Sequence, residues 1–164
     1  MSENNFKTNI TKDNKRQFSS RFSTLLGISI FLTGFLSIMG VYYIFHGIIV
    51  QEWTLSGFQD FAWRTLLFSS SIISFIGLVE IAVNEKPFSK ILTFCVKLIG
   101  GLFTASAFLI PRLPGYSSSG FEIFSCGSFV LIDGAILIPG LLLLILGGLI
   151  SESFHMQKEI DEII

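Results

Sequence analysis

Charged side chains are scarce in this chain of 164 residues, of which Asp, Glu, Lys and Arg make up only 14%. Ordinary soluble domains contain about 25% of these residues, so the composition argues against a soluble globular domain. The formal net charge is −1, which gives no general attraction to polyanions. We therefore expect no direct binding to nucleic acid.

Sequence motifs of known chemistry are also missing. The chain has two cysteines and two histidines, and it contains no HExxH, CxxC, phosphate-binding glycine loop or nucleophile elbow. Enzymes and metalloproteins need such groups at fixed spacings. We therefore predict that the protein is not an enzyme and has no cofactor and no metal.

Apolar residues, in contrast, make up 51% of the chain and gather in blocks. A membrane-spanning helix needs about 20 consecutive apolar residues, and four blocks approach or exceed that length. The sequence predicts an all-α integral membrane bundle of four transmembrane helices, with spans at about 22–50, 61–83, 91–110 and 129–150.

The positions of Lys and Arg predict the orientation, because loops rich in these residues stay in the cytoplasm. The polar segment 1–21 and the turn 84–90 carry most of them, whereas the loop 51–60 has none. Residues 1–21 are predicted to be a disordered, basic cytoplasmic tail. Both termini are then cytoplasmic, and the first and third loops face outward.

This orientation separates His46 from His155 by the membrane, so the two cannot share a metal ion or a haem. Cys95 and Cys126 are separated in the same way, which excludes a disulfide between them.

The C-terminal segment 151–164 is predicted to extend the fourth helix into the cytoplasm as an amphipathic, acidic tail. Its apolar residues follow i, i+4, i+7, i+8 spacing, at Met156, Ile160, Ile163 and Ile164. Two interpretations stay open for this stripe: packing on the protein's own loops, or docking of a protein partner.

Small residues give each span a face on which another helix can approach closely, which favours association in lipid. Gly140 and Gly147 lie seven residues apart in the fourth block, and Gly100 with Thr104 forms such a face in the third. These faces suit an internal bundle and a homo-oligomer equally well.

Four ionisable residues fall inside the apolar blocks, where charges are costly and often functional. Predicted depth allows the pairs Arg64–Asp133 and Glu80–Lys97. Each of these residues can also have a purely structural role. The cations can extend to the nearest interface, Asp60 can pair with Arg64, and Asp133 can cap the fourth helix.

The turn NEKPFSK (84–90) and the ending MQKEIDEII (156–164) stand in a chain with four apolar blocks. This order resembles a bacterial family of small multi-pass membrane proteins filed as domain of unknown function 2975. The resemblance covers nearly the whole chain after Arg21. It implies a location in the bacterial cytoplasmic membrane and a regulatory pairing with small helix-turn-helix proteins, and it implies no catalytic residues.

The sequence as a whole predicts a non-enzymatic accessory or regulatory protein that contacts membrane lipids and engages a protein partner. One alternative is an ion- or proton-translocating component that uses Arg64, Glu80, Lys97 and Asp133. A second alternative is a structural subunit of a larger membrane complex, in which the small-residue faces meet foreign helices.

Overall fold

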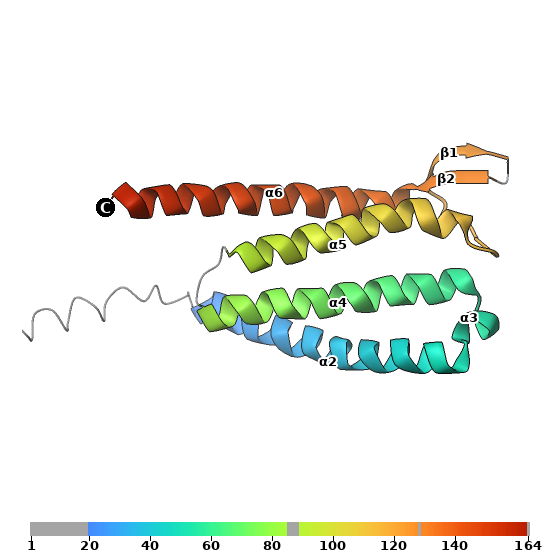
Figure 1. Cartoon of the computed structure of the whole chain (residues 1–164), viewed down its shortest axis with the longest axis horizontal. Helices are drawn as coiled ribbons and strands as arrows, with labels where there is room; N and C mark the ends of the chain where they lie inside the picture. The colour runs from blue at the N-terminus through green and yellow to red at the C-terminus, as the bar shows by residue number, and fades with distance from the viewer. Residues whose placement is uncertain (1–19, 85–88, 128, 164) are drawn as a thin grey trace, which may run out of the picture.

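The computed structural model describes residues 20–84, 89–127 and 129–163, with side chains described only as far as residue 156. Long helices dominate the fold (Figure 1): α2 (Ser20–Val50), α4 (Phe58–Asn84), α5 (Lys90–Leu109) and α6 (Gly134–Ile163). In the described residues these are the helices long and apolar enough to cross a membrane, and there are four of them. The predicted number of transmembrane helices is confirmed in that sense. The predicted tail 1–21 lies outside the described residues, apart from its last two residues in α2.

The predicted fourth span is wrong at its beginning. The sequence predicts helix from residue 129, but Phe129–Asp133 form strand β2, and α6 begins at Gly134. Strand β2 pairs antiparallel with β1 (Glu122–Cys126), which lies in the predicted third loop. Aromatic and β-branched residues favour a strand, and a nearby partner strand makes that choice available. The fold is therefore mostly helical with one β-hairpin, rather than all-α.

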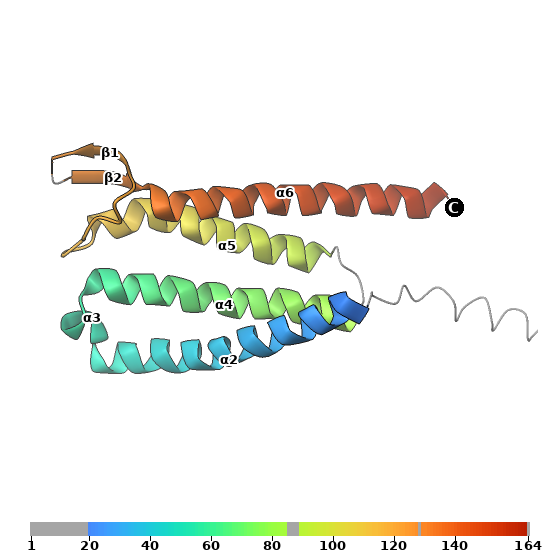
Figure 2. The same ribbon diagram turned by 180° about the vertical axis from the view of Figure 1, so that it is seen from behind.

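The four long helices lie in an open row rather than in a closed bundle. Helix α2 contacts α4, α4 contacts α5, and α5 contacts α6. In the described part of the chain the backbone of α2 does not approach that of α5 or α6, and the backbone of α4 does not approach that of α6. Figures 1 and 2 show this row from its two sides, with α2 and α6 at the edges. A closed bundle would need α2 against α6, a contact that the described residues do not contain, so the predicted bundle is not shown.

Helices α2 and α4 are joined by aromatic rings that fill glycine notches. Three rings of α4, spaced seven residues apart, pack on three glycines of α2, in the pairs Phe61–Gly47, Phe68–Gly40 and Phe75–Gly34. A Cβ atom added to Gly40 would lie 2.8 Å from the Cβ of Phe68. The glycines therefore set how closely these two helices approach.

Helices α5 and α6 approach through their backbones. A Cβ atom added to Gly100 would lie 2.8 Å from the backbone nitrogen of Leu144, and one added to Gly140 would lie 2.8 Å from that of Thr104. Such contact replaces the hydrophobic driving force that lipid removes. The small-residue faces predicted for the third and fourth spans are confirmed as the surfaces that meet.

One end of the row carries the short helix α3 (Glu52–Leu55) and the β1–β2 hairpin, and we call it the hairpin end. We call the opposite end, where α2 begins and α6 ends, the terminal end. A cluster of buried side chains joins α4, α5 and α6 at the hairpin end together with the 3₁₀ helix η1 (Ile110–Arg112), and it consists of Leu66, Ala107, Ile110 and Ile136. Tyr116, from the loop that follows η1, packs against this core.

Candidate functional site

Asp133, the acid of the fourth apolar block, caps helix α6. Its Oδ1 accepts the backbone N–H of Ala135 at 3.0 Å, as the side chain of an N-cap residue does. The same oxygen accepts the hydroxyl of Ser119 at 2.8 Å, and Oδ2 accepts the hydroxyl of Tyr116 at 2.9 Å. Asp133 is only 3% exposed, so these three donors take the place of water around a buried polar group.

Arg64 lies on the other side of α4 from this cap. Its guanidinium carbon is 6.0 Å from the centre of the Tyr43 ring on α2, at the outer limit of a cation–π contact. The described residues thus contain the cap of α6 by Asp133 but no Arg64–Asp133 ion pair.

Glu80 and Lys97, the second predicted pair, belong to different contacts. Lys97 packs its aliphatic stem on α6, where a Cβ atom added to Gly147 would lie 2.6 Å from the Lys97 Cγ. Glu80 is half-buried on α4, near the point where Gly77 packs against Cys95 of α5. Across the described ranges, no ion pair joins the two side chains.

The environment of Tyr116 changes its ionisation. Burial, followed by the hydrogen bond and the charge of Asp133, raises the pKa of the Tyr116 phenol from 10.0 to about 12. The phenol is therefore protonated at physiological pH and remains a donor to Asp133. This contact fixes the loop between η1 and β1 against the start of α6.

Gln59 fixes the same loop from the side of α4. Its amide nitrogen donates to the Ser117 carbonyl at 3.0 Å, and its amide oxygen accepts the Ser117 N–H at 2.7 Å. This two-point contact satisfies both backbone groups of Ser117, which would otherwise need water. Gln59 and Asp133 therefore hold the loop between α4 and α6.

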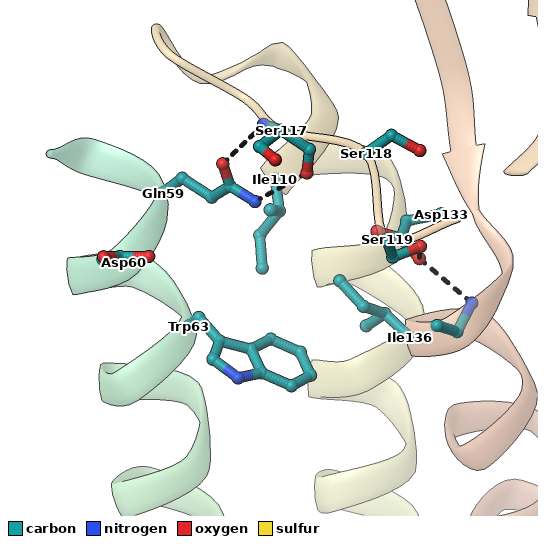
Figure 3. A pocket seen from close by; sticks show the side chains of 10 residues that line it. Gln59, Asp60, Trp63, Ile110, Ser117, Ser118, Ser119, Asp133 and Ile136 are labelled. Atoms are coloured by element: carbon teal, nitrogen blue, oxygen red, sulfur yellow. Dashed lines mark hydrogen bonds between the residues drawn. The ribbon is translucent and has the colours of Figure 1, made fainter. Parts of the chain in front are cut away.

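A cavity of about 300 Å³ lies between α4, this loop and the start of α6 (Figure 3). The Trp63 indole extends from α4 into the gap toward Ile136, and Ile110 closes a third side. Polar residues complete the lining, namely Gln59, Asp60, Ser117, Ser118, Ser119 and Asp133. The volume is at the lower end of the range for small-molecule sites. Of the four predicted ionisable residues, Asp133 alone lines this cavity.

The predicted partner-docking stripe lies at the terminal end. Helix α6 continues to Ile163, so Met156, Ile160 and Ile163 have the helical backbone that the prediction requires. Met156 is exposed. The side chains of Ile160 and Ile163, and the whole of Ile164, lie outside the described residues, and the stripe stays a prediction.

Several residues of the hairpin end have no assigned role in the sequence analysis. Gln59 gives no signal, because its partner is the backbone of a residue 58 positions away. Ser117, Ser118 and Ser119 stand out as a run of hydroxyls between two apolar blocks, which marks a polar loop but not its partners. An acid that caps a helix needs further donors when it is buried, and this requirement could have pointed to Ser119.

Comparisons of the chain with protein-family models, curated proteins and solved structures yield no match. The resemblance to the family of small multi-pass membrane proteins therefore stays a prediction. What the protein does has to be inferred from the side chains described above.

Proposed function

We propose that the protein is a non-enzymatic accessory or regulatory membrane protein that engages a protein partner. The open row of helices carries this proposal. In the described residues each long helix approaches no other long helix than its neighbours along the row, and 11% of the most apolar stretch of α2 is buried. A row that leaves its faces uncovered has room for foreign helices as well as lipid.

The open face of α5 supports a partner helix in particular. Gly101 has no atom within 4 Å of an added Cβ, and Ala105, one turn further on, is exposed. Small residues four positions apart allow close helix contact in lipid, and no other described helix packs on Gly101. A second copy of the chain could use the same face, which would give the homo-oligomer that the sequence also allows.

We place the protein in the bacterial cytoplasmic membrane with both termini in the cytoplasm. The basic residues of the tail and of the turn 84–90 favour this orientation. The C-terminal extension of α6 then offers its predicted stripe to a cytoplasmic segment of the partner. Ion translocation, the alternative, draws no support from Arg64 and Lys97, which lie apart in contacts with α2 and α6.

Purification from the native membrane in a mild detergent tests this proposal. We expect removal of residues 156–164 to abolish recovery of the partner, and Gly101→Leu to weaken this recovery. Both variants should still insert into the membrane. A tail with the same composition in scrambled order controls for charge. Unchanged recovery with both variants would contradict the proposal.

A further inference from the structure

We propose that the cavity at the hairpin end binds a small organic cation through its ammonium group. The proposal concerns the cavity lined by Asp60, Trp63, Asp133 and the serine loop, not the partner surface described above. Its charge, its aromatic wall and its apolar sides all point to this class of ligand.

Both charged residues that line the cavity are acidic. Asp133 is buried beneath it, and Asp60 lies on the first turn of α4, exposed, with no ion pair or hydrogen bond among the described residues. Two arginines are engaged elsewhere: Arg64 lies by the Tyr43 ring, and Arg112 donates to the carbonyl of Phe108. Among the described residues, therefore, no cation of the protein balances the negative charge of the cavity lining.

The two carboxylates have different roles in this proposal. Both oxygens of Asp133 already accept hydrogen bonds from Tyr116, Ser119 and Ala135, so this residue contributes mainly its electric field. The carboxylate of Asp60 is available for direct contact. A buried charge acts over a longer range than an exposed one because water screens it less.

The other walls favour an organic cation over a metal ion. The Trp63 indole, 37% exposed, extends into the cavity toward Ile136, with Ile110 on a third side, and an indole face attracts an alkylammonium group. Within the described ranges, no cluster of three His, Cys, Asp or Glu side chains is able to hold a metal. The serine hydroxyls can accept hydrogen bonds from an N–H group of the ligand.

Calorimetric titration of the full chain in a maltoside detergent, which contains no ammonium group, tests the proposal. The probes are ethylammonium and tetramethylammonium chloride at neutral pH, with tert-butanol as the neutral control. We expect saturable binding of the cations only. Asp60→Asn and Trp63→Leu should each weaken it by roughly two- to fivefold.

Two residues at the same end of the molecule, outside the cavity lining, serve as matched controls. Glu52→Gln removes an acid from α3, and Trp53→Leu removes an indole that packs on Phe58 and Phe61, and both variants should bind like the unchanged protein. The absence of saturable binding by the unchanged protein, or equal losses in Asp60→Asn and Glu52→Gln, would overturn the proposal.

The same titration in the presence of added lipid identifies the source of the ligand. If the ammonium belongs to a lipid headgroup, added phosphatidylethanolamine should lower the apparent affinity for ethylammonium in the unchanged protein. Phosphatidylglycerol should not compete. If phosphatidylethanolamine has no effect, the ligand is a free amine, and binding by the cavity still stands.

Discussion

Asp133 has a structural role, because its carboxylate accepts three hydrogen bonds and caps α6. An aspartate inside a span is a candidate for an ion pathway, but here it precedes α6 as its cap and accepts hydrogen bonds from Ala135, Ser119 and Tyr116. An N-cap of this kind contributes about 1 kcal/mol to stability. The sequence allows the cap as one of two alternatives, since an acid just before an apolar helix is a start signal. It does not identify the two hydroxyl donors, which come from a loop 14 and 17 residues earlier.

We expect the contact between Tyr116 and Asp133 to be lost at alkaline pH. The pKa of Tyr116 is about 12 in the folded protein and 10.0 as the ordinary value. The folded state thus binds the phenol proton more tightly than the unfolded state. The stability that the protonated Tyr116 contributes is therefore complete below pH 10 and is lost as the pH rises through about 12. Thermal unfolding of the detergent-solubilised protein from neutral to alkaline pH measures this.

Tyr116→Phe provides the control, because it removes the titrating group. The stability difference between the unchanged protein and this variant should shrink above pH 10, and the tyrosinate absorbance of Tyr116, obtained by difference, should appear near pH 12. A constant difference across the whole pH range would show that folding does not raise the pKa of Tyr116.

Helices and hairpin differ in how far the sequence predicts them. The spans are predicted well because long apolar blocks leave the chain few alternatives in lipid. Ser89 caps the third of these helices, α5, by accepting the N–H of Leu92 at 3.0 Å. The hairpin is missed because Phe129–Asp133 continues the apolar block that becomes α6. A short apolar run does not distinguish strand from helix, and the pairing with Glu122–Cys126 decides it.

Two adjacent glycines of α5 test the α5–α6 contact. Gly100 faces the backbone of α6, whereas Gly101 faces open space. We expect Gly100→Leu to separate the helices and destabilise the protein by about 1–3 kcal/mol, the usual cost of overpacking. Gly101→Leu should leave stability nearly unchanged. Thermal unfolding of the purified variants in detergent measures both, and equal effects would contradict the observed packing.

The arrangement of the whole molecule follows from which small-residue faces meet. Every span offers such a face in the sequence, so the sequence does not distinguish a closed bundle from a row. In the structure the glycines of α2 receive rings from α4, and those of α5 and α6 meet each other. The faces are used pairwise between neighbours, and none of these contacts brings α2 to α6.

The proposed orientation can be tested with the native cysteines. Cys126 is exposed in the hairpin, whereas Cys95 is buried. If both termini are cytoplasmic, a membrane-impermeant maleimide added to intact cells should label Cys126, and Cys126→Ser should abolish the labelling. Labelling of Cys126 only after the membrane is permeabilised would reverse the orientation.

The open row itself is tested most directly by the distance between its edge helices. Spin labels at Ile38 of α2 and Leu142 of α6, both exposed, would be measured by pulsed electron resonance in nanodiscs, with Cys95 and Cys126 replaced. Three interhelix spacings of about 8–10 Å each predict helix axes roughly 25 Å or more apart, and singly labelled protein reveals distances between copies. Axes within about 14 Å of each other inside one chain would mean a closed bundle and would contradict the row.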